Sequence, residues 1–476
     1  MPEPSSRSTA VVVLAAGVGK RLKSNLPKVL HPVCGRPALW HVIHAASGAR
    51  PERIVVVVHH GAEQVMEAVR QWGIRPEPSF VDQGQPLGTG HAVMVAEEAV
   101  GRAIDVLVMN GDDPLVAPEH VRRVMSLHRR SRSAATILTT EVDDPTGYGR
   151  VLRRGTELVD IVEEADASPE VKQIREISTI VYGFRRKDLF EALPLIGRGN
   201  RQNEYYLPQV LKVLQEKGRK VSATMVDLGG GLGLNTRAGL ATVNRIMRGR
   251  ILRTHMDNGV TVLDPAATYV DVGVRIGPDT VIHPLSFLEG ETRIGAGCVI
   301  GPSTRIVDSR VGDSSEVQFS VVRDARIGRA VSVGPFAHVR PGTVLADGAK
   351  AGSFVEIKAS RVGVRSKVPH LAYVGDATIG RDTNVGAGTV TVNYDGWDKH
   401  PTVIGDEVKI GSATMLVAPV KVGRRAMTGA GSVVTRDVPA GALAIERTEQ
   451  RNLPGFRDRK EKQKAAERRV RSKGDR

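Results

Sequence analysis

The chain has 476 residues, more than one ordinary domain holds, and 41% of them are hydrophobic, which is enough for a packed core. Its two cysteines, Cys34 and Cys298, exclude a disulfide framework and favour a reducing, cytoplasmic location. No apolar run approaches the ~18 residues of a membrane span. The short run 10–17 ends in a glycine loop, so it predicts a strand and not a secretory leader.

The formal net charge is +15, a value typical of some nucleic-acid-binding proteins. The charge is uneven, because residues 451–476 hold 11 Lys and Arg against 4 Asp and Glu, a net +7. Aromatic residues are only 4% of the chain, which leaves few surfaces for base stacking. We interpret this end as a solvated, disordered tail and do not expect nucleic acid as a partner. Contact of the tail with nucleic acid or a membrane is the open alternative.

The first predicted element is a buried strand over residues 9–15, and a glycine loop follows it. The loop contains Gly17 and Gly19, then Arg21 and Lys28. Glycines let backbone N–H groups approach an anion closely, and the basic side chains add charge, so the arrangement indicates phosphate binding. The signal is weak by itself, because the loop is neither a Walker loop nor a complete dinucleotide fingerprint.

Strands and helices then alternate, which predicts an α/β sheet with its site at the carboxyl ends of the strands. We expect helices over 37–49, 62–72 and about 91–100, and strands over 53–58, 78–83 and 105–109. Asp112 follows the last of these strands, where a metal-binding carboxylate would lie. A turn aspartate before Pro114 is an equally good reading of the sequence alone.

A repeat of six residues occupies about 271–438, for example at 276–281, 294–299 and 379–384. An aliphatic residue opens each unit and glycine usually follows. A period of six does not fit a helix and predicts short stacked strands, a parallel β-helix. A disordered glycine-rich tract is the alternative, but the aliphatic residues keep phase for more than a hundred residues. The rhythm loosens at 368–373 and breaks at 393–400, where a loop leaves the stack.

These motifs together carry a family resemblance. The stretch 14–28 resembles the signature of sugar-nucleotide pyrophosphorylases, and with 83–90, 111–112 and the repeat the chain resembles bifunctional N-acetylglucosamine-1-phosphate uridyltransferase / glucosamine-1-phosphate N-acetyltransferases over about 10–450. The resemblance implies an α/β N-terminal nucleotidyltransferase domain with a Rossmann-like mixed sheet, and a C-terminal left-handed parallel β-helix of hexapeptide repeats. We expect a nucleotidyltransferase domain at 1–237, a linker helix at 238–256, an acetyltransferase domain at 257–450 and the tail at 451–476.

The N-terminal half would join UTP to N-acetylglucosamine 1-phosphate and release pyrophosphate, by positioning and charge neutralisation. The resemblance assigns Arg21 and Lys28 to catalysis and Asp112 and Asn235 to Mg²⁺, a hard ion that prefers oxygen ligands. Without the resemblance, Asn235 reads as a turn residue. The residues assigned to UTP and the sugar nucleotide are Leu14, Ala15, Ala16, Gly17, Lys28, Gln83, Gly88, Thr89, Asp112, Gly149, Glu163, Ser178 and Asn235.

The C-terminal half would acetylate glucosamine 1-phosphate with acetyl-coenzyme A, and His370 is the expected base, because histidine titrates near neutral pH. A lone histidine is otherwise read as structural. The residues assigned to glucosamine 1-phosphate are Arg340, Lys358, Tyr373 and Asn384, and those assigned to acetyl-coenzyme A are Ala387, Asn393, Tyr394, Ser412, Ala430 and Arg447. The resemblance further implies a homotrimer formed through the β-helix, with sites at subunit junctions, and a role in cell-envelope synthesis.

The chain departs from the family pattern at one place, and two alternative functions remain open. Where the family carries an Asn and a Gly, this chain has Ser178 and Ile180, which predicts weaker sugar binding. A single-reaction pyrophosphorylase whose repeat only oligomerises is the first alternative, and His370 with the loop at 393–394 argues against it. A non-enzymatic, basic-tailed scaffold is the second, and the loop from Gly17 to Lys28 argues against it.

Overall fold

The computed structural model describes residues 8–229 and 233–474. The chain forms two compact units, Met1–Arg293 and Ile294–Arg476, and each is described by itself. The division falls inside the hexapeptide repeat, so the domain boundaries expected from the sequence remain predictions. Among the described residues, no helix combines the length and the apolar character needed to cross a membrane.

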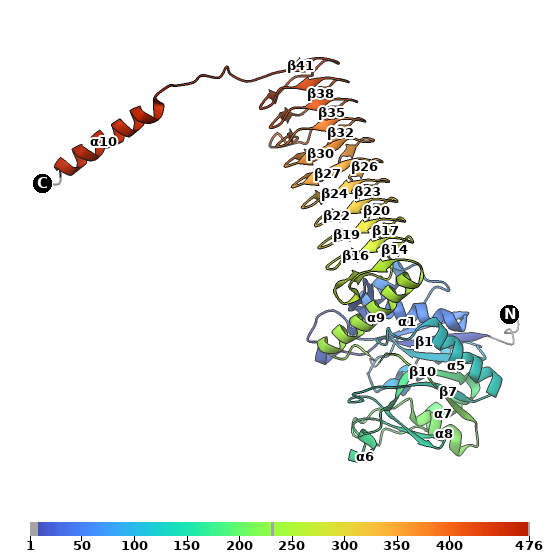
Figure 1. Cartoon of the computed structure of the whole chain (residues 1–476). Helices are drawn as coiled ribbons and strands as arrows, with labels where there is room; N and C mark the ends of the chain where they lie inside the picture. The colour runs from blue at the N-terminus through green and yellow to red at the C-terminus, as the bar shows by residue number, and fades with distance from the viewer. Residues whose placement is uncertain (1–7, 230–232, 475–476) are drawn as a thin grey trace. The chain divides into compact units, whose positions relative to one another are not determined.

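The first unit contains a mixed sheet with β1 (Thr9–Leu14) near its middle (Figure 1). Parallel neighbours flank β1 on both sides, β4 (Arg53–Val58) and β6 (Asp105–Asn110). The strand order is β11-β7-β10-β6-β1-β4-β5. The remaining strands are β5 (Ser79–Asp82), β7 (Ala135–Glu141), β10 (Glu176–Arg185) and β11 (Val221–Met225), with hairpins β2 (Pro32–Val33) and β3 (Arg36–Pro37), β8 (Arg150–Arg154) and β9 (Glu157–Val162).

β1 is buried along its whole length because apolar groups cover both faces of the sheet. Val11 and Val13 belong to one hydrophobic cluster, and Val12 and Leu14 belong to another. Strand β10 is antiparallel to both β6 and β7, which makes the sheet mixed. The expected α/β nucleotidyltransferase fold is therefore confirmed.

The helices of this unit follow the sequence expectation with two differences. The helix expected over 37–49 is α1 followed by a 3₁₀ turn, and the one expected to reach residue 100 is divided into α3 and α4. The helices are α1 (Ala38–Ala46), α2 (Ala62–Gln71), α3 (Thr89–Met94), α4 (Glu97–Val100), α5 (Pro118–Ser131), α6 (Pro169–Lys172), α7 (Arg186–Ala192), α8 (Gln209–Glu216) and α9 (Arg237–Asp257). Short 3₁₀ turns lie at Lys20–Leu22, Lys28–Leu30, Ser47–Ala49, Leu193–Leu195 and Pro265–Ala267.

Helix α9 begins after Thr236, whose hydroxyl accepts a hydrogen bond from the backbone N–H of Gly239 at 3.0 Å. One face of α9 packs through Val243 and Met247 into a small cluster with Leu115. The unit then continues as short strands, β12 (Thr261–Val262), β13 (Tyr269–Val270), β14 (Arg275–Ile276), β15 (Val281–Ile282) and β16 (Phe287–Glu289), and the division falls within β17 (Arg293–Ile294).

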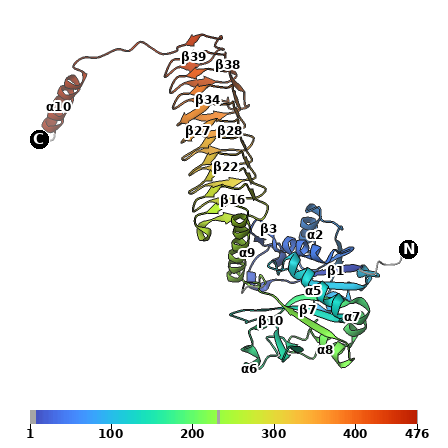
Figure 2. The same ribbon diagram turned by 45° about the vertical axis from the view of Figure 1, so that its right-hand side comes forward.

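The second unit is a stack of coils, each made of three short strands joined by turns (Figures 1 and 2). Sheet I contains β18 (Val299–Ile300), β21 (Glu316–Val317), β24 (Ser332–Val333), β27 (Lys350–Ser353), β30 (Lys367–His370), β33 (Asn384–Val385), β36 (Lys409–Ile410), β39 (Met427–Thr428) and β41 (Leu443–Ala444). Sheet II contains β19 (Arg305–Val307), β22 (Val321–Arg323), β25 (His338–Val339), β28 (Glu356–Lys358), β31 (Tyr373–Gly375), β34 (Val390–Val392), β37 (Met415–Val417) and β40 (Val433–Val434). Sheet III contains β20 (Arg310–Val311), β23 (Arg326–Ile327), β26 (Val344–Leu345), β29 (Arg361–Val362), β32 (Ala377–Ile379), β35 (Thr402–Ile404) and β38 (Val420–Val422).

One aliphatic side chain from each strand fills the interior of the stack. In sheet I, Val317, Val333, Ala351 and Val368 pair in register from coil to coil, and all four are buried. Each coil buries little by itself, so the stack is stabilised by its neighbours. The expected left-handed β-helix of hexapeptide repeats is thus confirmed.

The C-terminal segment differs from the expected disordered tail. Residues Phe456–Gly474 form helix α10, and its side chains are exposed from Phe456 to Arg468. The composition explains the helix, because Ala, Glu, Lys, Arg and Gln are good helix formers. Arg457 also pairs with Glu461 four residues later at 2.9 Å, in an arrangement that supports helices.

Candidate active sites

The glycine loop after β1 lies at the carboxyl end of the central strand. Leu14, Ala15 and Ala16 are buried, whereas Gly17 is exposed and a Cβ atom on it would meet no neighbour. Gly19 has a φ of +65°, and a Cβ there would lie 2.8 Å from the Cβ of Lys28. The loop therefore needs glycine at residue 19 to fold back on Lys28.

Lys28 joins two side chains that are distant in the sequence. Its Nζ donates to Oδ1 of Asn235 at 2.7 Å and forms a close ion pair with Oδ2 of Asp112. Asp112 follows β6, and its backbone carbonyl accepts from Leu234 at 3.2 Å. The fold thus gathers three residues that the resemblance assigned to phosphate and metal.

This cluster fits a hard cation. Oδ1 of Asp112 is buried and has no hydrogen-bond partner among the described residues. Two oxygen ligands, from Asp112 and Asn235, already converge on the positive charge of Lys28. Across residues 8–229 and 233–474 no group of three His, Cys, Asp or Glu side chains could hold a metal. A cation here would therefore depend on substrate oxygens for its remaining ligands, as Mg²⁺ commonly does.

Two residues that the sequence analysis missed complete this cluster. Asp113 is buried, and burial together with the neighbouring Asp112 carboxylate raises its pKa well above the usual range. Burial also raises the pKa of Tyr148, as do the nearby Asp113 and Asp112, and Tyr148 hydrogen bonds to Asn235. A buried, electronegative environment of this kind attracts cations.

Gln83 and Gly88 lie in the loop between β5 and α3, and Thr89 is the first residue of α3. The Gln83 side chain is buried and donates to the carbonyl oxygen of Gly88 at 3.0 Å. Gly88 has a φ of +105°, and a Cβ on it would lie 2.7 Å from the carbonyl oxygen of Tyr205. The hydroxyl of Thr89 accepts from the backbone N–H of Leu207 at 3.1 Å. These contacts fix the loop that the resemblance assigns to the nucleotide.

A second group forms where β8, β9 and β10 meet. The carbonyl of Gly149 accepts from the backbone N–H of Ser178 at 2.9 Å, and a Cβ on Gly149 would lie 3.3 Å from Oε1 of Glu163. The Ser178 hydroxyl is buried and lies 2.7 Å from the hydroxyl of Tyr182. Its contact with a sugar remains a prediction, since this hydroxyl already has a partner inside the protein.

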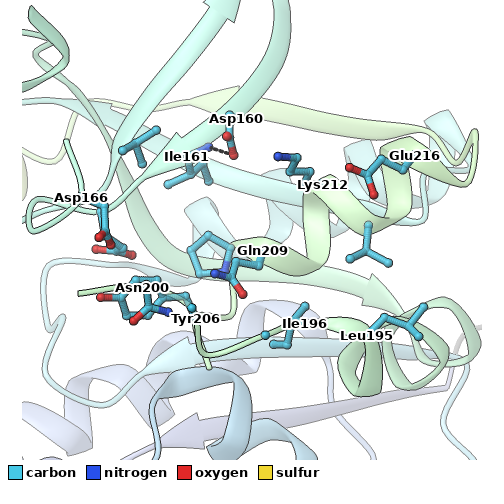
Figure 3. Close-up of a pocket in the computed structure, with 16 residues that line it drawn as sticks. Asp160, Ile161, Asp166, Leu195, Ile196, Asn200, Tyr206, Gln209, Lys212 and Glu216 are labelled. Carbon is cyan, nitrogen blue, oxygen red and sulfur yellow. Dashed lines mark hydrogen bonds between the residues drawn. The ribbon is translucent and has the colours of Figure 1, made fainter. Parts of the chain in front are cut away.

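Glu163 borders a cavity of about 450 Å³, shown in Figure 3. Burial raises the pKa of Glu163 to about 7, with contributions from Asp166 and Glu204. Asp166 and Tyr206 also line the cavity, and burial and the nearby Asp166 raise the pKa of Tyr206 to about 12. The cavity offers a sugar several oxygen acceptors and a group that titrates near neutral pH.

Arg150 forms an ion pair with Glu164, the residue after Glu163, and the sequence analysis did not predict this pair. We call the Arg150–Glu164 pair the clamp. Arg150 is only 1% exposed, and its Nη2 donates to Oε2 of Glu164 at 2.5 Å. Arg150 also bonds to the carbonyl of Tyr148, and Glu164 accepts from the backbone N–H of Gly147 at 3.3 Å. The clamp holds the turn that carries Gly149. A glycine turn at 147–149 and two adjacent acidic residues at 163–164 were the available signals, but only the fold reveals the pairing.

The sugar-phosphate residues expected in the second unit lie on two different sheets. Arg340, Lys358 and Tyr373 belong to sheet II or directly follow it, where Glu356 pairs with Tyr373 and Lys358 pairs with Gly375. Asn384 lies on sheet I, in register with Lys367 below and Lys409 above. The structure therefore brings three of these four residues onto one face of one chain, but not Asn384.

Two charged residues join the sheet II group and were missed. Asp376 pairs with Nζ of Lys358 at 3.4 Å, and the amide of Asn393 donates to the same carboxylate oxygen. Lys399 lies beside Lys358, whose ammonium group lowers the pKa of Lys399. Lys399 reaches this position because the loop after β34 folds back through a bridge between Tyr394 and Lys399. Adjacent cations of this kind suit a phosphate.

His370 ends strand β30, opposite Ser353 of the preceding coil. Its side chain is exposed, and among the described residues it has no hydrogen-bond or ion-pair partner. Ala387, Ser412 and Ala430 lie in the turns of the next three coils, whereas Asn393 and Tyr394 lie in the loop. Arg447 donates to the carbonyl of Ala430 at 3.2 Å. Most of the expected coenzyme residues thus follow one edge of the stack above His370.

Comparison with known proteins agrees with both halves of the molecule. A family model described as "MobA-like NTP transferase domain" matches residues 11–181, and one described as "Bacterial transferase hexapeptide (six repeats)" matches residues 401–436. A solved UDP-glucose pyrophosphorylase complexed with UDP-glucose is 20% identical over 51% of this chain and 99% of that structure, with a TM-score of 0.42. That score is too low to support an argument.

Relatives match along nearly the whole chain. The bifunctional protein GlmU of Heliobacterium modesticaldum is 48% identical over 454 residues, which are 95% of this chain and 98% of the relative. The GlmU proteins of Caldanaerobacter subterraneus subsp. tengcongensis and Streptomyces avermitilis are each 46% identical, over 94% and 97% of this chain and 96% of each relative. With both folds and the two residue clusters in place, the chain belongs to the bifunctional GlmU family, as an enzyme with uridyltransferase and acetyltransferase activities.

Proposed function

We propose that the second unit acetylates glucosamine 1-phosphate with acetyl-coenzyme A, and that the first unit then transfers UMP from UTP to the product and releases pyrophosphate. The observation that carries the proposal is the pair of separate charged clusters, Lys28–Asp112–Asn235 in one unit and Lys358–Asp376–Lys399 in the other. Each cluster combines cations with oxygen ligands, as phosphate chemistry requires.

In the uridylyl reaction, the sugar phosphate attacks the α-phosphorus of UTP. The loop at 14–17 and the buried Gln83 would bind the nucleotide, while Arg21 and Lys28 would neutralise the phosphates. Asp112 and Asn235 would hold Mg²⁺, which neutralises triphosphate charge when bound. Oδ1 of Asp112, which has no hydrogen-bond partner within the described part of the chain, supports this assignment. Gly149 and Glu163 would face the sugar.

In the acetyl reaction, Arg340, Lys358 and Lys399 would bind the phosphate of glucosamine 1-phosphate. His370 would accept the proton that the amine loses as its nitrogen attacks the thioester carbon. Coenzyme A leaves as the thiol. The exposure of His370 supports this role, because a base must reach the substrate. Ala387, Ser412 and Ala430 would line the coenzyme groove.

The proposal also includes the assembly and location expected for the family. Hexapeptide β-helices support oligomerisation, and we place three chains around one axis, with the acetyl sites at the junctions. We assign the enzyme to the cytoplasm, where UTP and acetyl-coenzyme A are available, and its product to cell-envelope synthesis.

One assay tests the two activities separately. The full chain is supplied with glucosamine 1-phosphate, acetyl-coenzyme A, UTP and Mg²⁺, and thiol and pyrophosphate release are followed independently. We expect both products from the wild type. Pyrophosphate formed only when N-acetylglucosamine 1-phosphate is supplied, with no thiol release, would instead identify a single-reaction pyrophosphorylase.

Two reciprocal substitutions assign the residues. His370→Ala should lower thiol release by roughly 10²–10⁴-fold, the usual contribution of a general base, and leave pyrophosphate release from N-acetylglucosamine 1-phosphate unchanged. Asp112→Ala should do the reverse, with a loss on the order of 10²-fold or more in uridylyl transfer. Uridylyl transfer by the wild type in excess chelator would refute the metal assignment. Loss of both activities in either folded variant would refute the separation of the two sites.

A further inference from the structure

The loop 393–400, between β34 and β35, carries one cation of the proposed phosphate site. That cation is Lys399, which lies beside Lys358 of the stack. The rest of the loop is largely open to solvent, because Tyr394 is 56% exposed and Trp397 is 86% exposed. A loop without a buried core of its own must be fixed by hydrogen bonds within it, and the structure shows which ones these are.

The base of the loop is closed on the stack. Asn393 is buried, and its amide donates to the carboxylate of Asp376. The carbonyl oxygen of Asn393 accepts from the backbone N–H of His400 at 2.8 Å. A bridge between Tyr394 and Lys399 continues this pairing by one step. The loop is therefore a hairpin, and the backbone of Lys399 belongs to its returning arm.

The tip of the hairpin is held by one carboxylate. Oδ1 of Asp395 accepts from the backbone N–H groups of Trp397 and Asp398, each at 2.8 Å, which is an Asx turn. Oδ2 of Asp395 lies 2.7 Å from Nε2 of His400. Bonds from Asp398 and then from His400 hold the pKa of this carboxyl well below its usual range. The carboxylate thus joins the tip of the loop to the residue that follows Lys399.

Lys399 needs such support because its neighbours repel it. The Lys358 ammonium group lowers the pKa of Lys399, as Arg340 does to a smaller extent, and the Asp376 carboxylate offsets only part of this. Like charges this close push a flexible side chain away until an anion arrives. Ordering that side chain at the moment of binding would weaken the affinity, and a loop fixed in advance reduces this cost.

We propose that His400, through its bond to Asp395, is a positioning residue that holds Lys399 at the phosphate of glucosamine 1-phosphate. His400 does not touch the substrate in this role, since it acts through the backbone of the preceding residue. The inference rests on the proposed acetyl site, and it adds the group that orients one of the three phosphate-binding cations.

The first test removes and then restores the bond in the full chain. His400→Phe keeps an aromatic ring but has no donor for Asp395, whereas His400→Gln keeps a side-chain N–H. Thiol release is measured while glucosamine 1-phosphate and acetyl-coenzyme A are varied in turn. His400→Phe should raise the KM for glucosamine 1-phosphate about tenfold, roughly the value of one charge-assisted hydrogen bond. The kcat and the KM for acetyl-coenzyme A should stay at the wild-type values, and His400→Gln should recover most of the loss.

A double-mutant cycle shows whether His400 acts through Lys399. Lys399→Met removes the ammonium group and should raise the same KM. Adding His400→Phe to Lys399→Met should then raise it no further, because the group being positioned is already absent. Effects that multiply in the double variant would overturn the inference, since they would show that His400 supports the site by another route.

Arg424→Ala is the matched control. Arg424 forms an exposed ion pair with Glu407 that has the same length of 2.7 Å, in turns that carry no proposed substrate residue. It should leave both KM values unchanged, and pyrophosphate release from N-acetylglucosamine 1-phosphate should be unchanged in every variant. A His400→Phe enzyme with the wild-type KM for glucosamine 1-phosphate would overturn the inference and leave the proposed activities intact. A wild type that releases no thiol would overturn the proposed acetyl reaction, and the inference with it.

Discussion

The charged side chains that we compare in the two units differ in how far they are exposed to solvent. In the first, the side chains of Lys28 and Asp112 are 16% and 4% exposed, and that of Arg150 is 1% exposed. In the second, Arg340 and Glu356 form a pair in which each side chain is 39% exposed, and Arg365 pairs with Asp382 at 61% and 35%. The ionic groups at the first site are therefore largely buried, whereas these two ion pairs of the second unit are exposed.

The architecture explains this difference. Loops at the carboxyl ends of a doubly covered sheet fold over one another, so they enclose polar groups between them. A coil of the β-helix has room inside for one aliphatic side chain per strand, so every charged residue must point outward. The charged groups of the first site are therefore enclosed within one unit, whereas these charged pairs of the second unit are open to water.

We expect the largest loss of unfolding free energy from a substitution in the buried Arg150–Glu164 clamp. Glu164→Ala leaves the Arg150 guanidinium buried without a counterion, and we expect a loss of roughly 3–5 kcal/mol in unfolding free energy. Arg150→Met should cost less, because Glu164 is 30% exposed and can be solvated. Urea unfolding of the two variants measures which substitution lowers the unfolding free energy more. If Arg150→Met is the more damaging change, the clamp is not governed by the buried charge.

We expect Glu163 to have a smaller effect on the unfolding free energy, and one that depends on pH. Its pKa rises from the ordinary 4.5 to about 7, first through burial and then through Asp166 and Glu204. Between these values the folded state keeps a proton that the unfolded state loses. Unfolding free energy should therefore fall as pH rises through this window, and the full penalty should be present above about pH 7.

Glu163→Gln removes this titration. Its gain in stability over the wild type should grow with pH to on the order of 3 kcal/mol above pH 7, and should approach zero near pH 4.5. Denaturant unfolding at several pH values measures the difference. A gain that does not change with pH would show that Glu163 is solvated and not buried.

The smallest effect is expected on the surface of the β-helix. The Arg365 guanidinium contacts both carboxylate oxygens of Asp382 at 2.7 Å, yet both side chains are well solvated. Arg365→Ala should cost only about 0.2–1 kcal/mol, and less in high salt. Thermal unfolding with and without added salt provides the measurement. A loss as large as that for Glu164→Ala would remove the proposed contrast between the units.

Much of the site in the first unit could be anticipated from short motifs. The loop from Gly17 to Lys28 and the position of Asp112 after an apolar strand placed phosphate and metal chemistry at one edge of the sheet. Asp113, Arg150 and Glu164 could not be found in this way. Their roles depend on burial and on partners brought close by folding, and neither property has a local sequence pattern.

In the second unit the sequence predicted the fold well but not which edge of the stack carries which side chains. The six-residue period determined the strands, the stack and the buried column from Val317 to Val368, because one inward aliphatic residue per strand is a strictly periodic demand. The same regularity conceals differences between edges. Phe336 and Phe354 occupy ordinary places in the repeat, and only their positive φ and exposure distinguish them.

The sequence by itself determined the α/β domain, the repeat domain and the family, because periodicity and glycine motifs are properties of neighbouring residues. The tertiary structure alone decided that Lys28 meets Asn235 across 207 positions, that Arg150 is buried, and that Asn384 and Tyr373 lie on different sheets. These are consequences of long-range packing. Which side chains are buried, which of them pair and which way they face are fixed only when distant segments pack into one core.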